Sequence, residues 1–402
     1  MAKSTKRYFE IDSTLKNYPS ARYYFLLGAR GCGKTYPVMK KAIKDAIDGN
    51  GVFAYVRRYK DAITETKLQD LCSPLNQWVA EYTDGAWNKI NYWRHRWYLE
   101  RWEENEDTGE WTRVDKNPTP LGIAVAMNTW ENDKGPDFGA DKGGMAHIIL
   151  DEALSAGGNY LVDEWGKFQN VISSFVRDRW EKDTKIWLLA NPVSKYGGPY
   201  LKNLGLSKSM LNEFGTYEIT YPSDDGKPDK NGMRTVFVYI AASTTSSGKT
   251  TSVDDARTMV YKQFFAFPNS KGKSKSITHG YWEMEDANGL DSGIYKDSEN
   301  IDTVWVKFDE ELLAIDIMCY EDTGVYYLFI RPSNEIPRKR YFITLSMSLS
   351  EYAILGIRSP HPVNTVIKKI LQTNQVYFSD FETADIWHGF LHEDKLQFPA
   401  SL

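Results

Sequence analysis

The sequence has few cysteines and no long apolar run. Only Cys32, Cys72 and Cys319 occur among its 402 residues, and they lack the CxxC or Cys/His spacing of zinc sites and disulfide frameworks. Such sparse cysteine usage is typical of a reducing, intracellular compartment. No apolar stretch approaches the ~20 residues that cross a bilayer, and the charged N-terminus lacks the apolar core of a signal peptide. We therefore expect a soluble, cytosolic protein with no membrane partner.

Positive charge is also limited. Lys and Arg number 49 against 54 Asp and Glu, a net charge of −5, which argues against a wholly basic nucleic-acid coat but permits a local basic channel. A hydrophobic content of 42% with 14% aromatic residues is enough for packed cores and disfavours disorder. The length suggests two domains.

Apolar patterns near the N-terminus predict an α/β fold. Residues 22–27 and 51–56 have the composition of buried strands, and an amphipathic helix follows Lys34 between them, which is how a doubly wound sheet begins. Residues 91–115 alternate aromatic and charged side chains around a polar turn, so a hairpin is predicted within this fold. Further strands are predicted at 121–127, 145–153, 185–192, 216–221 and 234–243, and a helix at 163–182.

Linker-like composition divides the chain. Residues 244–252 and 269–276 are rich in Ser, Thr, Gly and Lys and flank a predicted helix at 253–267. We therefore predict three parts: an α/β domain at 1–243, a linker region at 244–302 and a small α+β domain at 303–402. Three strands and then a helix at 363–372 are predicted in the last part.

Residues 28–35, GARGCGKT, match the Walker A pattern G-x-x-x-x-G-K-[ST] between a predicted strand and helix. Backbone N–H groups of this loop and the dipole of the helix are predicted to bind nucleotide phosphates. Lys34 is expected to neutralise the β- and γ-phosphate oxygens during catalysis, and Thr35 to bind Mg²⁺. A glycine-rich helix cap is the alternative. The loop residues are Gly28, Ala29, Arg30, Gly31, Cys32, Gly33, Lys34 and Thr35.

An acidic pair ends the predicted strand HIILDE at 147–152. The carboxyl end of a parallel strand lies at the sheet edge where the phosphates also lie, so Asp151 is predicted to orient Mg²⁺ and Glu152 to polarise the attacking water. A small-molecule kinase does not need that glutamate, and the pair therefore favours an ATP hydrolase of the additional-strand, RecA-like class. A helix N-cap pair is the alternative. Asn191, near the end of strand 185–192, is predicted to sense the γ-phosphate, or else to be a turn residue before Pro192.

Several basic residues are candidates for coupling or trans-acting roles. Arg57 and Arg58 follow the second strand at the same sheet edge, and Arg177 and Arg179 end the helix that follows the acidic pair. Either of the latter could act as an arginine finger on a neighbouring subunit, with Arg177 as the catalytic candidate, and Lys134 in a Gly-rich loop is a weaker one. For each of them a solvated surface position is the alternative.

With these motifs in order, the chain resembles the DNA-packaging ATPases of small tailed bacteriophages with protein-primed linear genomes, a divergent branch of the large-terminase motors. The segments GARGCGKTY, FAYVRRYK, IILDE and FVRDR carry this resemblance over residues 23–192. It implies a homo-oligomeric ring, expected to be a pentamer, that pumps double-stranded DNA into an empty capsid with ATP and Mg²⁺. The ring would form in the host cytoplasm and bind transiently to the portal, or connector, at the capsid vertex, in some members with a packaging RNA.

The resemblance also implies a C-terminal domain of RNase H-like fold that is vestigial as a nuclease. Asp316 lies in a predicted strand where a first metal-binding acid would occur, and Asp380, Glu382 and Asp385 are later candidates. Two other functions stay open: a large terminase with an active nuclease, and an ATP-dependent assembly switch without translocation. The aromatic and basic segment at 91–102 fits DNA contact or a half-buried hairpin equally well.

Overall fold

The computed structural model describes most of the chain outside the predicted linker region. The described residues are 6–7, 9, 11–28, 32–130, 143–155, 160–176, 183–193, 199–207, 210–211, 214–220, 234–240, 244–245, 298–309, 311–335, 340–346, 351–373 and 375–397.

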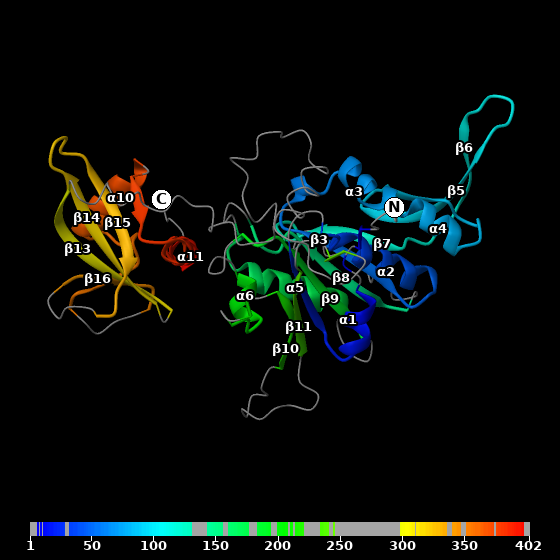
Figure 1. Cartoon of the computed structure of the whole chain (residues 1–402). Helices are drawn as coiled ribbons and strands as arrows, with labels where there is room; N and C mark the ends of the chain where they lie inside the picture. Colours follow the sequence, from blue (N-terminus) through cyan, green and yellow to red (C-terminus); the bar gives the residue numbers. More distant parts are fainter. Residues whose placement is uncertain are drawn as a thin grey trace.

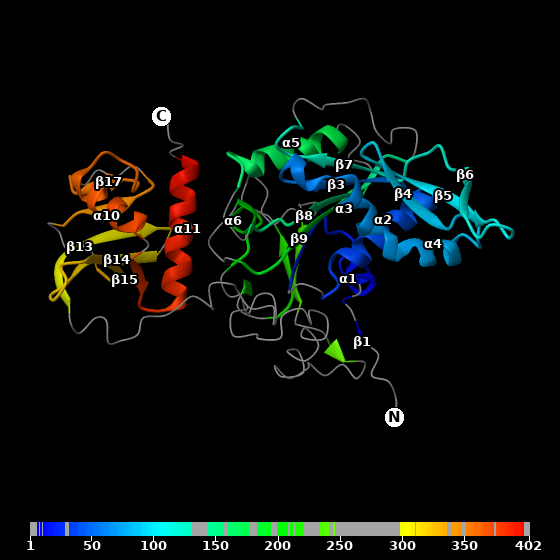
Figure 2. The ribbon, with the colours of Figure 1, turned by 90° about the horizontal axis from the view of Figure 1, so that it is seen from above.

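Parallel strands form the centre of the first sheet (Figures 1 and 2). Their spatial order is β11 (Arg234–Ile240), β2 (Tyr23–Gly28), β9 (Lys185–Ala190), β8 (Met145–Asp151), β3 (Val52–Arg57) and β7 (Gly122–Ala126). Strand β9 therefore lies between the strand that leads into the phosphate loop and the strand that ends in the acidic pair. This extra strand defines the additional-strand class, so the predicted fold of the first domain is confirmed.

Helices cover both faces of this sheet. Tyr24 and Leu26 of β2 pack in one core with α2 (Thr35–Ile47), α3 (Glu65–Cys72) and α4 (Asn76–Tyr82), and α1 (Asp12–Asn17) also lies against it. Phe25 and Leu27 point into a second core with α5 (Glu164–Val176) and α6 (Pro199–Asn203). Because alternate side chains face opposite sides and both sides are buried, β2 is apolar throughout.

Antiparallel strands extend the sheet at both edges. β10 (Gly215–Thr220) pairs with β11, and β5 (Arg96–Glu104) pairs with β7 at the other edge and with β4 (Lys89–Trp93) and β6 (Trp111–Lys116). The predicted hairpin around the polar turn is confirmed as β5–β6. A second tight turn, which joins β4 to β5, was not predicted. Its residues Arg94 and His95 have φ of 48° and 63°. Glycine usually marks such left-handed turn positions in a sequence, and neither residue is glycine.

The C-terminal domain has its own sheet. β13 (Ser298–Phe308), β14 (Glu311–Tyr320) and β15 (Tyr326–Pro332) are antiparallel, and β16 (Phe342–Thr344), β17 (Ala353–Leu355) and β18 (Val376–Phe378) add parallel pairings. Helices α10 (Pro362–Gln372) and α11 (Phe381–Gln397) contribute Ile367, Ile370, Trp387 and Phe390 to the core. The α+β class is confirmed, while the RNase H-like assignment stays a prediction.

Four elements of this domain were not predicted: the short strands β17 and β18, and the longer β13 and α11. β13 begins at Ser298, five residues before the predicted boundary at 303, because its exposed polar start is held by pairing with β14 rather than by an apolar pattern. α11 lacks a clear apolar stripe, since buried Thr383 and Asp385 lie among its apolar residues.

The remaining described elements are short. β1 (Lys6–Arg7) pairs with β12 (Thr244–Thr245), and the 3₁₀ turns are Lys60–Ala62 and Ser73–Leu75. The predicted helix at 253–267 lies outside the described residues, as does the end of the helix predicted at 163–182. None of the helices in the described ranges combines the length and apolar character that a membrane crossing needs.

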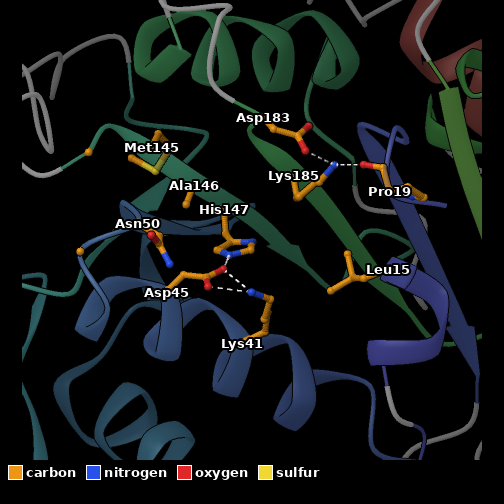
Figure 3. Close-up of a pocket in the computed structure, with 12 residues that line it drawn as sticks. Leu15, Pro19, Lys41, Asp45, Asn50, Met145, Ala146, His147, Asp183 and Lys185 are labelled. Carbon is orange, nitrogen blue, oxygen red and sulfur yellow. Dashed lines mark hydrogen bonds and ion pairs between the residues drawn. The ribbon is translucent and has the colours of Figure 1, made fainter. Parts of the chain in front are cut away.

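A cavity of about 560 Å³ lies at the sheet edge opposite the phosphate loop, beside the first residues of β8 and β9 (Figure 3). His147 Nε2 is 2.7 Å from Asp45 Oδ2, and Trp187 Nε1 donates to His147 Nδ1 at 3.1 Å. Because an indole N–H can only donate, Nδ1 carries no proton and the neutral ring donates from Nε2 to Asp45. Lys41 also binds Asp45, at 2.6 Å.

Lys185 completes the polar lining of this cavity. Its ammonium donates to the carbonyls of Pro19 and Ala21 at 2.5 and 3.0 Å and pairs with Asp183 at 2.7 Å. Three acceptors use all three N–H groups. The charged groups around the cavity are therefore satisfied by one another, and we interpret the cavity as a structural feature.

The buried imidazole makes stability depend on pH. Burial lowers the pKa of His147 below its usual 6.5, although Asp45 acts in the opposite direction. As the pH falls below about 6.5, the unfolded chain binds this proton before the folded chain does, so the stabilisation present above that pH is lost. We expect the free energy of unfolding to fall more steeply from about pH 7 to about pH 5 in the wild type than in His147→Gln. Urea unfolding followed by circular dichroism measures both slopes, and equal slopes would contradict the prediction.

Candidate nucleotide site

The described part of the predicted phosphate loop comprises Gly28 and residues 32–35. Gly33 has a φ of 92°, which favours glycine, and α2 begins two residues later, so its N-terminus faces the loop. A Cβ on Gly28 would lie 2.9 Å from Cys32 Sγ, so only glycine allows this close approach. Burial raises the pKa of the Cys32 thiol despite the opposing effect of Lys34. Ala29, Arg30 and Gly31 lie outside the described residues.

Lys34 joins the loop to the additional strand. Its ammonium donates to the Gly28 carbonyl at 2.6 Å and to Asn191 Oδ1 at 3.0 Å. Asn191 follows β9, which is paired with β2, so two residues distant in sequence meet at one sheet edge. The structure thus brings together the predicted phosphate-binding lysine and the predicted sensor.

Arg57 bridges the acidic pair. Its Nη1 donates to Asp151 Oδ2 at 3.1 Å and its Nη2 to Glu152 Oε2 at 2.6 Å. The Arg57 side chain is 15% exposed and that of Glu152 is 57% exposed, so the arginine is packed while the glutamate faces solvent. Burial alone would lower the pKa of Arg57, but the neighbouring negative charges raise it above its usual value. The guanidinium is therefore a permanent cation beside both acids.

The backbone at Glu152 is unusual. Its φ is 59°, a left-handed conformation that is uncommon for a residue with a side chain and is concentrated at functional sites. The N–H of Glu152 donates to Asp151 Oδ1 at 3.0 Å, which helps to hold this conformation. In this conformation the side chains of Asp151 and Glu152 both reach the Arg57 guanidinium.

Tyr55 is a site residue that sequence reasoning missed. Its hydroxyl donates to Asp151 Oδ2 at 2.5 Å, and burial, followed by the charge of Asp151, raises the pKa of Tyr55 well above 10. It therefore remains a neutral donor. The available signal was the two-residue alternation of a strand, which places Tyr55 on the same face as Arg57.

Arg58 lies in a different environment from its neighbour. It donates to Glu164 through Nε at 2.7 Å and Nη2 at 2.8 Å, and to the carbonyls of Glu152 and Ala153 at 3.1 and 2.9 Å. Tyr200 donates to Glu164 at 2.7 Å, and both partners of the ion pair are buried. Arg58 therefore holds the backbone that follows the acidic pair, and Glu164 is a second residue that sequence reasoning missed.

The oxygen donors at this edge fit a magnesium ion. Thr35 is the first residue of α2 and Asp151 the last of β8. A hydroxyl and a carboxylate suit Mg²⁺, which takes one or two protein ligands and completes its shell with water and substrate phosphates. The remaining trans-acting candidates, Arg177, Arg179 and Lys134, lie outside the described residues.

Asp316 in the C-terminal domain is surrounded by donors and not by other acids. It is fully buried, accepts from Arg331 Nε and Thr303 Oγ1 at 2.7 Å each, and lies on β14 between β13 and β15. Asp380 instead accepts from the N–H of Thr383 at 2.8 Å, at the start of α11. Within the described ranges, no three His, Cys, Asp or Glu side chains come together as a metal-binding group.

Comparisons with known proteins agree with the resemblance drawn from the motifs. No protein-family model matches the chain. It is 26% identical over 196 residues to a DNA packaging protein of Bacillus phage B103, which is 48% of this chain and 51% of that protein. The chain thus spans about half the length of this curated relative.

The fold is shared with a solved packaging-motor structure. The bacteriophage Phi-29 viral genome packaging motor assembly aligns with a TM-score of 0.51 at 16% identity, covering 96% of this chain and 99% of that chain. The Phi-28 gp11 DNA packaging motor aligns with a TM-score of 0.49 at 16% identity, covering 98% and 99%. The similarity to phage packaging proteins expected from the sequence is therefore confirmed.

The buried Arg58–Glu164 pair generates a stability prediction. Replacing Glu164 by Gln leaves the guanidinium buried without its counter-charge, so we expect a loss of roughly 3 kcal/mol of unfolding free energy. The matched control is Glu103→Gln, because Glu103 pairs with Arg101 on the surface, with 58% of its side chain exposed; we expect a change below about 1 kcal/mol there. Chemical denaturation measures both, and equal losses in the two variants would contradict the assigned role of Glu164.

Proposed function

We propose that this chain is an ATP-driven motor that translocates double-stranded viral DNA into a preformed capsid as a subunit of a homo-oligomeric ring. The observation that carries the proposal is the placement of Lys34, Asn191 and the Asp151–Glu152 pair after three adjacent parallel strands. The curated relative, a DNA packaging protein, and the shared fold of the Phi-29 packaging motor support the cargo.

Phosphate binding would use the loop and Lys34. The backbone N–H groups at the start of α2 point toward the nucleotide site, where the helix dipole favours anions. Lys34 now donates to Gly28 and Asn191, and phosphate oxygens would compete for the same N–H groups. Asn191 would then sense the γ-phosphate, because Lys34 would bind both the Asn191 side chain and the phosphate oxygens.

Hydrolysis would require Arg57 to release Glu152. The Glu152 oxygen that accepts from the Arg57 guanidinium at 2.6 Å is occupied by that hydrogen bond and is not available to an attacking water. Breaking the pair would free Glu152 to orient and deprotonate the attacking water. Tyr55 would keep Asp151 oriented during this change, because its hydrogen bond does not depend on Arg57.

Thr35 and Asp151 would hold Mg²⁺, directly or through water. The ion supplies Lewis-acid stabilisation of charge on the phosphate oxygens. We further propose that Arg177, Arg179 or Lys134 of a neighbouring subunit neutralises charge at this site, and that the ring assembles at the capsid portal with or without a packaging RNA.

The test is Glu152→Gln. The amide keeps the size of the side chain but cannot accept the proton, so we expect ATP binding to be retained and hydrolysis to fall by about 10²-fold or more. The control is Glu103→Gln, because Glu103 lies near the end of β5 and outside the candidate site. This variant should hydrolyse ATP at the wild-type rate. Nucleotide titration and phosphate release measure the two properties, and a variant that still hydrolyses ATP would refute the assignment of Glu152.

A second measurement addresses the cargo. ATP hydrolysis by a translocase should rise when double-stranded DNA and a portal-bearing capsid shell are added, because the motor completes its cycle only on its track. A rate that is unchanged by both would instead support an ATP-dependent assembly switch. Metal-dependent cleavage of plasmid DNA that is lost in Asp316→Ala would support a terminase with an active nuclease.

A further inference from the structure

The β5–β6 hairpin projects beyond the rest of the first domain (Figure 1). We call residues 96–116 the arm. Within the described chain β6 pairs only with β5, and its side chains are exposed, with Trp111 at 58% and Val114 at 46%. Large apolar side chains on a solvent-facing edge strand are characteristic of an interaction surface.

Cations without acidic partners gather where the arm leaves the domain. Lys89, Arg94 and Lys116 lie over aromatic rings: Lys89 Nζ is 3.6 Å from the Trp102 ring centre, and Arg94 and Lys116 are 4.3 and 4.7 Å from that of Trp93. None of the three forms an ion pair with a carboxylate in the described ranges. We call these three cations the arm base.

The acid that faces the arm base in the strand register does not neutralise it. Glu100 is directly opposite Lys89 and Lys116 in the strand register, but it is buried and its oxygens accept from Arg113, Asn91 and Trp102 at 2.8–3.0 Å. The positive charge of the arm base is therefore available to another anionic group.

The far end of the arm carries the opposite charge. Glu104, Glu106, Asp107 and Glu110 are exposed and have no cationic partner in the part of the chain that the structure describes; we call them the arm tip. The turn is ordered, because Asn105 Oδ1 accepts from the N–H groups of Asp107 and Thr108 at 2.9 and 3.2 Å.

The arm cannot satisfy its own charges. The β5–β6 ladder runs from the Glu100–Lys116 pair to the Glu104–Trp111 pair, with a register shift between Arg101 and Trp102, and its length holds the tip away from the base. Charges that are complementary but kept apart within one molecule can meet only between two molecules.

We propose that the arm tip of one copy docks on the arm base of the next copy. Such a contact is heterologous, with different surfaces on the two partners, and successive contacts of this kind close into a ring when the rotation permits. The inference rests on the homo-oligomer of the proposed function and names one of its interfaces. Trp111, beside the tip, adds apolar area to the contact.

Nucleic acid is the other polyanion that the base could bind, and the arm disfavours it. The rings at the base are already covered by their own cations, which leaves them less free to stack on bases. The acidic tip on the same hairpin would repel a phosphate backbone that ran along the arm. A compact acidic turn of another copy meets neither obstacle.

The experiment is a compensating charge reversal in the full-length chain. The tip variant is Glu104→Lys, Glu106→Lys and Glu110→Lys, and the base variant is Arg94→Asp and Lys116→Glu. Each alone places like charges together, so we expect the dissociation constant of the oligomer to rise about tenfold or more. The combined variant restores opposite charges with their signs exchanged and should return to within about threefold of the wild type. Sedimentation velocity over a concentration series measures all three.

Lys369→Glu is the matched control. Lys369 is an exposed cation on α10, a helix that packs in the core of the C-terminal sheet and not against the arm, so its reversal should leave the dissociation constant unchanged. The tip residues lie on an exposed turn, which keeps the tip variant independent of folding, and melting temperatures check the base variant.

Several outcomes would overturn the inference. They are an unchanged dissociation constant in the tip variant, a combined variant as weak as its parents, and a base variant that loses nucleic-acid binding while its oligomer stays intact. A wild-type chain that hydrolyses ATP but sediments as a monomer at every concentration would remove the interface while leaving the ATPase assignment standing. Loss of hydrolysis only in Glu152→Gln tests that assignment separately.

Discussion

Three neighbouring parallel strands, β2, β9 and β8, end at one sheet edge, and the candidate site depends on that edge. Lys34 reaches Asn191 there because β2 and β9 are paired in register from Tyr23 to Leu27. The register is strongly determined, since a slip of one residue would exchange the side chains of β2 between two different cores. Packing on both faces of the sheet therefore sets the geometry of the candidate site.

Two adjacent arginines at that edge have different ionic partners. Arg57 ends β3 on the face of Tyr55 and reaches the carboxylates of Asp151 and Glu152. Arg58 turns to the other side, where buried Glu164 neutralises it. The first arginine binds the two carboxylates of the candidate site, and the second holds the backbone that follows them. Two neighbouring residues of the same type therefore have different structural roles.

Charge separation matters again in the arm. The net charge of the chain is −5, but within the arm the base is cationic and the tip is anionic. Buried Glu100 does not neutralise the base, because its oxygens accept hydrogen bonds from Arg113, Asn91 and Trp102. The carboxylate of Asp316 is bound in the same way, because it accepts hydrogen bonds from Arg331 and Thr303. In both cases a partner on a neighbouring strand decides whether an acid is available for function.

The phosphate-loop motif, the acidic pair and the strands that carry them could be predicted from the chain, because glycine spacing and apolar runs are local patterns that need no knowledge of the fold. The hairpin could be predicted from its polar turn in the same way. Only the folded structure shows that Tyr55 and Glu164 join the candidate site, that Arg57 and Arg58 have different partners, and that β13 starts at Ser298. These features arise from pairing between residues distant in the chain, and hydrogen bonds and ion pairs of that kind leave no periodic signal in the sequence.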